Sequence, residues 1–370
     1  MSLALTPLGL LYGAVARARL RLYASGVLKT ERVGVPVVSV GNLTAGGTGK
    51  TPLVEWVARA LAAEGLRACV LTRGYGRDDE GRRVVASDGV WVLAEASECG
   101  DEPRLLAERL VGVASVVCDR DRVAAARWAR AELGAEVFVL DDGFQHLRVA
   151  RDLDIVTVDA TAPWGGGHML PRGRLREPVS SLGRANCVVI TRADLAEDIE
   201  GLRAEVGRVS GGRAAVFTSR VRTRGLAPLG GVELESRVEV RSAGDAKGGS
   251  MTYAEGRPRF GASDVGRRVA AFCAVGNPGA FFEQLRREGF ELCLTRAFAD
   301  HHAYTAADVE AVSREAASRG AAALLTTAKD AVKLRGFEFR LPCYVVEIGL
   351  EFDDEAALLG LVRRAVSAAR

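Results

Sequence analysis

A glycine-rich segment that ends in lysine and threonine is the part of this chain that most clearly predicts chemistry. Residues 37–56 read VVSVGNLTAGGTGKTPLVEW, an apolar run, a glycine-rich turn and the start of a helical pattern. Glycines let successive backbone N–H groups converge on phosphate oxygens at the positive end of a helix. Lys50 would bring a mobile charge to the outer phosphates and Thr51 a hydroxyl to Mg²⁺. The segment therefore predicts a nucleoside triphosphate site, whose contacts we expect from Thr44, Ala45, Gly46, Gly47, Thr48, Gly49, Lys50 and Thr51.

This loop differs from the strict phosphate-loop pattern. G-x-x-x-x-G-K-[ST] has glycine where this chain has Thr44, so the loop is nearer the G-G-x-G-K-T variant of dimerising P-loop ATPases. Those ATPases usually carry an extra lysine where this chain has Ala45. Lysine is rare here, which indicates that the ammonium group in the loop matters. Of the 50 cationic residues, the lysines are Lys29, Lys50, Lys247, Lys329 and Lys333.

Two adjacent carboxylates follow a second apolar run. Residues 137–146 read VFVLDDGFQH, so Asp141 and Asp142 end a predicted buried strand. The carboxyl ends of parallel strands meet at the sheet edge where a phosphate loop lies, and carboxylates there hold Mg²⁺ directly or through water. A strand-ending turn rich in Asp and Gly is the structural alternative. The presence of the phosphate loop favours the metal site.

Two further segments could supply a general base. Residues 100–103 read GDEP, which places Asp101 before a helix started by proline, and residues 298–304 read FADHHAY in a chain with only 4 histidines. A histidine–carboxylate pair can take the proton of an acceptor hydroxyl with its pKa set near neutrality. Taken separately, the two segments would read as a helix cap and a surface histidine. Asp101 and His301 are predicted to act together only if the chain phosphorylates an acceptor.

Apolar strand-like runs alternate with helical patterns, which predicts an α/β fold with a parallel sheet of the P-loop NTPase type. The strands expected in one sheet are residues 37–40, 68–72, 115–118, 137–140, 155–158 and 188–191. A second, smaller α/β series should follow a polar, glycine-rich ribbon. Its expected strands are residues 269–275, 322–326 and 343–348. The predicted division is an N-terminal helix (1–23), a phosphate-loop domain (24–215), a β-ribbon linker (216–260) and a C-terminal α/β domain (261–370).

Composition limits the possible functions. The chain has 370 residues, 48% of them hydrophobic, which is enough for two domains with cores of their own. With 50 basic and 47 acidic residues, the near balance gives no case for a nucleic-acid partner. Nothing in the sequence leads us to infer an obligate protein partner. The seven cysteines show no metal-ligand spacing and are read as small core residues.

The N-terminus combines an apolar stretch with cations. Residues 3–15 are largely apolar and precede Arg17, Arg19 and Arg21. The stretch is too short, and too interrupted by Pro7, to span a bilayer. A signal peptide would carry its cations before the apolar stretch instead of after it. Two interpretations remain from the residues alone: a helix packed on the protein body, or an interfacial helix whose arginines meet anionic headgroups.

Motifs along nearly the whole chain resemble one family. In order and spacing the chain is similar to tetraacyldisaccharide 4′-kinase, the kinase of lipid A biosynthesis, through GNLTAGGTGKTP, LTRGYGR, GDEP, DDGFQH, GRLREP, FADHHAY and TAKDAVKL. The resemblance implies transfer of the γ-phosphate of ATP, with Mg²⁺, to the 4′-hydroxyl of a tetraacylated glucosamine disaccharide 1-phosphate. It also implies a peripheral, monotopic protein at the cytoplasmic face of the inner membrane. In that setting the N-terminal segment is an interfacial helix.

The resemblance also implies roles for individual residues. Lys50 and Thr51 would serve the phosphates and the metal, while Asp101 with His301 would form the base pair. The metal would be held by Thr51, Asp141 and Asp142, with Glu177 nearby. Weaker assignments place Arg73, Tyr75 and Arg122 in the acceptor pocket.

Two other functions stay open at this point. One is a kinase of a soluble sugar or cofactor, which the arginine-flanked apolar N-terminus disfavours. The other is a partner-regulated, dimeric P-loop ATPase, which Ala45 disfavours because that group carries a lysine there.

Overall fold

The computed structural model describes residues 5–77, 79–229 and 265–369. Its helices are α1 (Thr6–Ala24), α2 (Lys50–Ala63), α3 (Ala96–Cys99), α4 (Asp101–Arg109), α5 (Arg122–Glu132), η2 (Val179–Arg184), η3 (Ala193–Leu195), α6 (Ile199–Val209), α8 (Pro278–Arg287), α9 (Ala306–Ser318), α10 (Ala328–Ala331) and α11 (Glu355–Ala368). Its strands are β1 (Val37–Asn42), β2 (Ala68–Thr72), β3 (Val84–Ser87), β4 (Ala114–Cys118), β5 (Val137–Asp141), β6 (Leu153–Asp159), β7 (Cys187–Thr191), β8 (Ala215–Pro228), β9 (Arg268–Cys273), β10 (Glu291–Ala297), β11 (Leu324–Thr327) and β12 (Cys343–Phe352).

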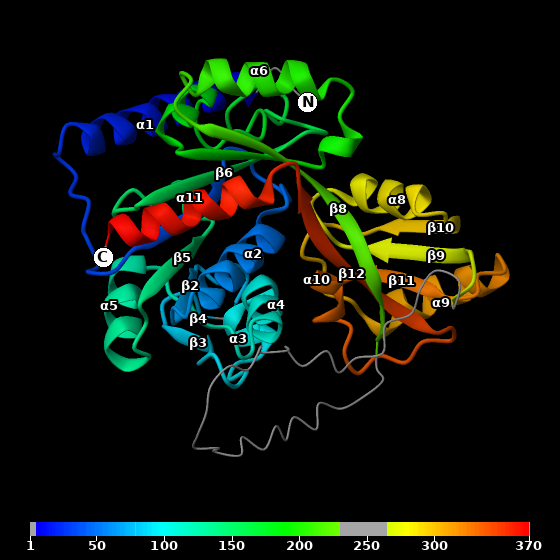
Figure 1. Ribbon diagram of the computed structural model, residues 1–370. Helices are drawn as coiled ribbons and strands as arrows, with labels where there is room; N and C mark the ends of the chain where they lie inside the picture. The colour runs from blue at the N-terminus through cyan, green and yellow to red at the C-terminus, as the bar shows by residue number, and fades with distance from the viewer. Residues whose placement is uncertain (1–4, 78, 230–264, 370) are drawn as a thin grey trace.

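The described strands form one twelve-stranded sheet in the order β10-β9-β11-β12-β8-β7-β6-β1-β5-β2-β4-β3 (Figure 1). Its ladders are parallel except where β8 meets β12 and β3 meets β4. The predicted α/β class is confirmed, and so are the six strands expected in one sheet. The sequence analysis missed β3 and β10.

Helices pack on both faces of the sheet, because successive strand residues point to opposite sides. In β1, Val38 and Val40 share a buried cluster with apolar residues of α2, α4 and α11, whereas Val37 belongs to a cluster with α5. Strand β1 is buried along its whole length. The near-continuous apolar runs of the predicted strands follow from this two-sided burial.

The long strands β8 and β12 join the two parts of the sheet (Figure 1). We call β1 to β7 and their helices the N-terminal half. We call β9 to β11 and their helices the C-terminal half. Strand β8 pairs in parallel with β7 and antiparallel with β12, so the sheet is continuous. The predicted linker begins within β8, and its part from residue 230 lies outside the described residues. The domain boundaries at 215 and 260 stay a prediction.

The connectivity places the chemistry at one sheet edge. Strand β1 lies between β5 and β6, to which it runs parallel, so the segments after these three strands leave from the same edge. Ligands of open α/β sheets bind at such an edge, where the strand order changes direction.

Candidate active site

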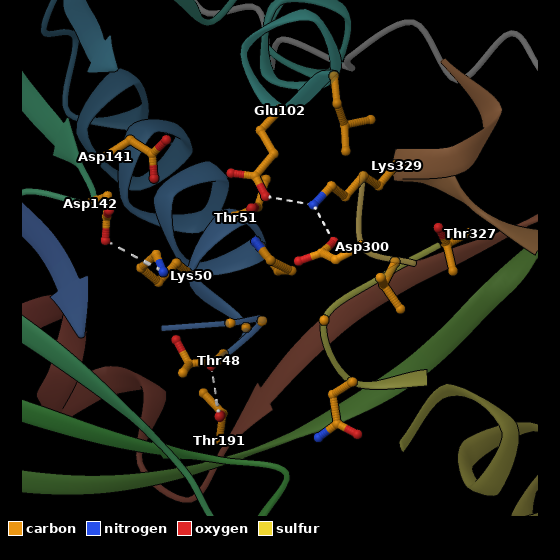
Figure 2. Close-up of a pocket in the computed structure, with 18 of the residues that line it drawn as sticks. Thr48, Lys50, Thr51, Glu102, Asp141, Asp142, Thr191, Asp300, Thr327 and Lys329 are labelled. Atoms are coloured by element: carbon orange, nitrogen blue, oxygen red, sulfur yellow. Dashed lines mark hydrogen bonds and ion pairs between the residues drawn. The ribbon is translucent and has the colours of Figure 1, made fainter. Parts of the chain in front are cut away.

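The predicted phosphate loop connects β1 to α2, which begins at Lys50. Gly49 caps the helix with φ 79°, and Gly46 has φ 113°, backbone conformations that favour glycine. Buried side chains fix the loop from three strands. Thr48 Oγ1 lies 2.9 Å from Asn42 Nδ2 and 2.8 Å from Thr157 Oγ1, and Thr191 Oγ1 donates to the Thr48 carbonyl at 2.9 Å (Figure 2). These hydrogen bonds fix the conformation of the loop.

The two aspartates lie beside this loop in different environments. Asp142 forms ion pairs with Lys50 at 3.4 Å and with Arg176 at 2.5 Å. Burial opposes its ionisation, but these two cations hold the pKa of Asp142 below its usual range. Asp141 is almost fully buried and accepts a hydrogen bond from Thr72 at 2.9 Å. Burial first, and then the charges of Glu102 and Asp142, raise the pKa of Asp141 to about 6.

The residues around the loop fit a magnesium ion bound together with a nucleotide. The Oδ1 atom of Asp141 is buried and accepts no hydrogen bond within the described residues, and Oδ1 of Asp142 has the Lys50 ammonium at 3.4 Å as its partner. Across the described parts of the chain, no three or more His, Cys, Asp or Glu side chains gather as a complete metal site. Mg²⁺ needs no such cage, since it commonly uses one or two carboxylates, waters and substrate phosphates.

The predicted base pair comes together across the two halves. Asp101 is the first residue of α4, and its Oδ2 lies 3.4 Å from Nδ1 of His301, 200 positions away. Lys333 lies 3.6 Å from the same carboxylate oxygen. Burial disfavours the charged form, but the His301 hydrogen bond and the Lys333 charge outweigh it and lower the pKa of Asp101. These contacts therefore favour the ionised form of Asp101.

One pocket of about 770 Å³ contains most of the predicted site. Predicted residues that line it are Gly46, Gly47, Thr48, Gly49, Lys50, Thr51, Arg73, Tyr75, Arg122, Asp141, Asp142 and His301. Thr44 and Ala45 line a small neighbouring hollow with Arg174 and Asp159. Asp101 does not line the pocket and instead contacts His301, which does.

The residues assigned to an acceptor pocket lie in different surroundings. Tyr75 is 67% exposed, and its ring meets the His301 ring edge-on at 5.8 Å. Arg73 pairs with Glu80 at 3.2 Å. Arg122 is buried, and this burial lowers its pKa to about 10.

Glu177 is not brought into the pocket. Its buried carboxylate pairs with Arg184 at 2.9 Å, and Glu177 is absent from the pocket lining. The neighbouring Arg176 is the residue of this segment that reaches Asp142.

Several residues without a predicted role join the two halves at the pocket. Lys329 contacts Glu102 at 3.1 Å and Asp300 at 3.3 Å (Figure 2). Asn277 donates to Asp159 at 3.1 Å and to Thr161 at 3.0 Å. Lysine rarity was the available signal for Lys329, since two of the few lysines lie in one short motif, TAKDAVKL.

Comparison with known proteins gives one consistent result. A family model described as tetraacyldisaccharide-1-P 4′-kinase matches residues 1–367. A tetraacyldisaccharide 4′-kinase of Anaeromyxobacter dehalogenans is 46% identical over 325 residues, which cover 87% of this chain and 79% of that protein. One from Geobacter sulfurreducens is 39% identical over 349 residues, covering 94% of this chain and 89% of that protein.

A solved structure extends the similarity to the fold. The crystal structure of LpxK from Aquifex aeolicus in complex with ATP aligns with a TM-score of 0.73 and 29% sequence identity. The alignment covers 98% of each chain.

Proposed function

Because this chain belongs to the tetraacyldisaccharide-1-P 4′-kinase family, we propose that its pocket holds ATP beside the 4′-hydroxyl of a tetraacylated glucosamine disaccharide 1-phosphate. The γ-phosphate is then transferred to that hydroxyl, a step of lipid A biosynthesis. The observation that carries this proposal is the shared pocket. Lys50 and Thr51 of the phosphate loop and His301 of the predicted base pair line one cavity.

The phosphate loop and its neighbours bind and orient the donor. Backbone N–H groups at the start of α2, together with the Lys50 ammonium, stabilise negative charge on the transferring phosphoryl group. Thr51, Asp141 and Asp142 are the residues that would hold Mg²⁺. When bound, this ion would supply positive charge that offsets the negative charge of the phosphates. Arg176 keeps the Asp142 carboxylate ionised and directed toward Lys50.

Asp101 and His301 are proposed to orient the acceptor hydroxyl and to take its proton. The lowered pKa of Asp101 makes its carboxylate a weak base. A weak base suits phosphoryl transfer, because the loose transition state needs little bond formation to the nucleophile before the proton leaves. Tyr75, which is exposed and lies against His301, is placed to contact the acceptor sugar.

We further propose that α1 meets the membrane surface that carries the acyl chains. Its buried residues are Gly9 and Gly13, which pack on the segment around Met169. Large apolar side chains on the rest of the helix are exposed, namely Leu8, Leu10, Leu11, Tyr12, Val15 and Leu22. Tyr12 also lines the pocket, so the helix leads from the proposed membrane surface to the acceptor site. Among the described helices, none is both long and apolar enough to cross a bilayer.

The reaction can be tested with purified protein, γ-labelled ATP, Mg²⁺ and the disaccharide lipid dispersed in detergent. We expect label in the lipid, and transfer about 10³-fold slower with Lys50→Met. The fully deacylated disaccharide 1-phosphate should be a poor acceptor. Equal phosphorylation of the deacylated sugar would favour a kinase of soluble sugars, and no transfer to either acceptor would contradict the proposal.

The membrane role can be tested separately by sedimentation with anionic vesicles. Wild-type protein should sediment with vesicles, and less so at high salt, because the exposed Arg17, Arg19 and Arg21 attract anionic headgroups. Deletion of residues 1–23 should reduce sedimentation and raise KM for the lipid. Binding that does not depend on salt would exclude the arginines as its cause.

A further inference from the structure

Lys329 occupies the boundary between the two halves, and the reaction outlined above gives it no role. It is the second residue of α10 in the C-terminal half, and its side chain is only 15% exposed. Its ammonium lies 3.1 Å from Glu102 in α4 and 3.3 Å from Asp300. A third contact reaches Nε2 of His301, also at 3.3 Å. Lys329 thus touches the ring nitrogen that Asp101 leaves free.

The hydrogen-bonding chemistry of these groups determines the state of the ring. An ammonium can only donate, so Nε2 must accept from Lys329. An ionised carboxylate can only accept, so Nδ1 must donate to Asp101. Both contacts require the same neutral tautomer, with the proton on Nδ1 and the lone pair on Nε2.

We propose that Lys329 is a positioning residue, which donates to Nε2 and so holds His301 in the tautomer and ring orientation that aim Nδ1–H at Asp101. This inference rests on the proposed roles of Asp101 and His301 as the base pair. Lys329 acts through His301 and not on the transferred group.

The backbone at both ends of this contact supports the proposal. His301 has φ 62°, a left-handed conformation that is costly for a residue other than glycine and persists only where its surroundings hold it. Lys329 projects from a rigid turn, because the buried Asp330 accepts hydrogen bonds from Tyr304 at 3.1 Å and from Thr327 at 2.6 Å. Two fixed backbones therefore meet through one side-chain contact.

The carboxylates around Lys329 keep its side chain protonated, so that it acts as a hydrogen-bond donor. Burial works against the ammonium, but the carboxylates of Glu102 and Asp300 outweigh burial and raise the pKa of Lys329. Its counter-ions come from both halves, so the ion pair between Lys329 and Glu102 forms only when α4 and the C-terminal half are together.

Two other roles would explain the same position and must be separated by experiment. Lys329 could bind a phosphate of the donor, since it lines the pocket. It could also be a simple ion pair between the halves. Arg335 provides a matched control for the second role, because it pairs with Glu108 of α4 at 2.5 Å without contacting Asp101 or His301.

The test compares full-length Lys329→Met, Lys329→Arg and Arg335→Gln with the wild type. Nitrogen-15 NMR of the histidine rings, at about pH 8.5 where an ordinary imidazole is neutral, reports which nitrogen carries the proton. With only 4 histidines in the chain, His301→Gln identifies the signal. Steady-state kinetics, ATP affinity and melting temperature are measured on the same proteins.

We expect the Nδ1–H tautomer in the wild type and in Lys329→Arg, and a mixture of tautomers in Lys329→Met. In Lys329→Met, kcat should fall about 10- to 100-fold, the loss typical of residues that orient a metal-binding side chain through a hydrogen bond. ATP affinity should change less than about threefold. Lys329→Arg should recover part of kcat, and Arg335→Gln should keep both kcat and tautomer.

Three results would overturn the inference: an unchanged tautomer in Lys329→Met, a loss of ATP affinity large enough to explain its rate, or an equal loss of kcat in Arg335→Gln. Failure of the base roles themselves would look different. Asp101→Asn and His301→Gln would then both keep full activity, whatever the NMR of Lys329→Met shows.

Discussion

The two ends of the pocket are built in contrasting ways. The nucleotide end consists of a loop and two aspartates that follow neighbouring parallel strands, and its hydrogen bonds lie within the N-terminal half. The base end consists of Asp101 from α4 and His301 from the C-terminal half, held by the side chains of Lys329 and Lys333. One end is fixed by a sheet, and the other by side-chain contacts between the two halves.

This difference indicates how the site can separate binding from chemistry. A loop fixed by buried hydrogen bonds is ready for a nucleotide before it arrives, so little binding energy is lost in ordering it. A base that spans two halves is correctly placed only when the halves are together, and interfaces of this kind are where relative motion is expected. Damage to the nucleotide end should therefore affect the transferred charge, and damage to the base end should affect the acceptor.

The largest effect is expected at the nucleotide end, from Lys50→Met. Removing a preorganised cation from a phosphoryl-transfer site should lower kcat by about 10³-fold, or about 4 kcal/mol of transition-state stabilisation. Lipid KM should stay within about twofold of the wild type, since Lys50 does not touch the acceptor. Steady-state kinetics in saturating Mg²⁺ measures both values.

Arg176→Met is the control, because it removes the other cation paired with Asp142. We expect a smaller loss of kcat and a higher Mg²⁺ requirement. Turnover of Lys50→Met near the wild-type rate would mean that the nucleotide site is misplaced.

The next largest effect should come from the base end, where Asp101→Asn and His301→Gln are each expected to lower kcat by about 10²-fold. The double variant should have a kcat only slightly below that of the less active single variant, because the effects of substituting two groups that act as one unit are not additive. ATP affinity should survive in all three proteins, which isothermal calorimetry can measure.

Additive losses would show that the two residues act independently. A loss of stability is the rival explanation, since Asp101 begins α4. Equal melting temperatures for wild type and variants would exclude that explanation.

The same contrast decides what the sequence could predict. The phosphate loop and the Asp141–Asp142 pair are contiguous motifs on predictable strands, so local pattern was sufficient. Six strands of the N-terminal half were predicted for the same reason, because they are buried apolar runs, whereas the short and partly buried β3 was missed. The alternation in β10, with exposed positions along it, is weaker and was missed.

Contacts between distant segments could not be predicted from local pattern. Asp101 and His301 were paired through the chemistry of a histidine–carboxylate base and through family resemblance, and neither segment's local pattern shows that they meet. Nothing in the motif TAKDAVKL indicates that Lys329 lies against Glu102 and His301, because this depends on the antiparallel pairing of β8 with β12. Glu177 pairs with Arg184 and does not line the pocket, so its place near the metal stays a prediction.

A third, smaller effect concerns stability at the nucleotide end. The pKa of Asp141 is raised to about 6, so the wild type gains stability when this group is protonated and loses it as pH rises from about 4 through 6. Without Mg²⁺ and nucleotide, Asp141→Asn should therefore be more stable than wild type by about 2 kcal/mol at pH 7.5. Urea unfolding at several pH values measures the difference.

The advantage of Asp141→Asn should shrink as pH falls through about 6 and vanish near about pH 3, where the wild-type carboxyl is protonated in both the folded and unfolded states. Asp198→Asn serves as control, because that carboxylate caps α6 and does not line the pocket. A constant difference across the pH range would mean that ionisation of Asp141 is not the cause.

The smallest effect tests whether the two ends are independent. A Cβ at Gly276 would lie 2.6 Å from the backbone nitrogen of Gly47, so Gly276→Ala must push the C-terminal half and the loop apart. Because strands hold the loop, we expect the C-terminal half to yield. This should cost about 1 kcal/mol in kcat, roughly fivefold, with ATP affinity unchanged. Gly279→Ala is the matched control, since its Cβ meets nothing closer than 3.9 Å and alanine favours the helix α8. A loss of ATP affinity as large as the loss of kcat would show that the nucleotide end depends on its contact with the C-terminal half.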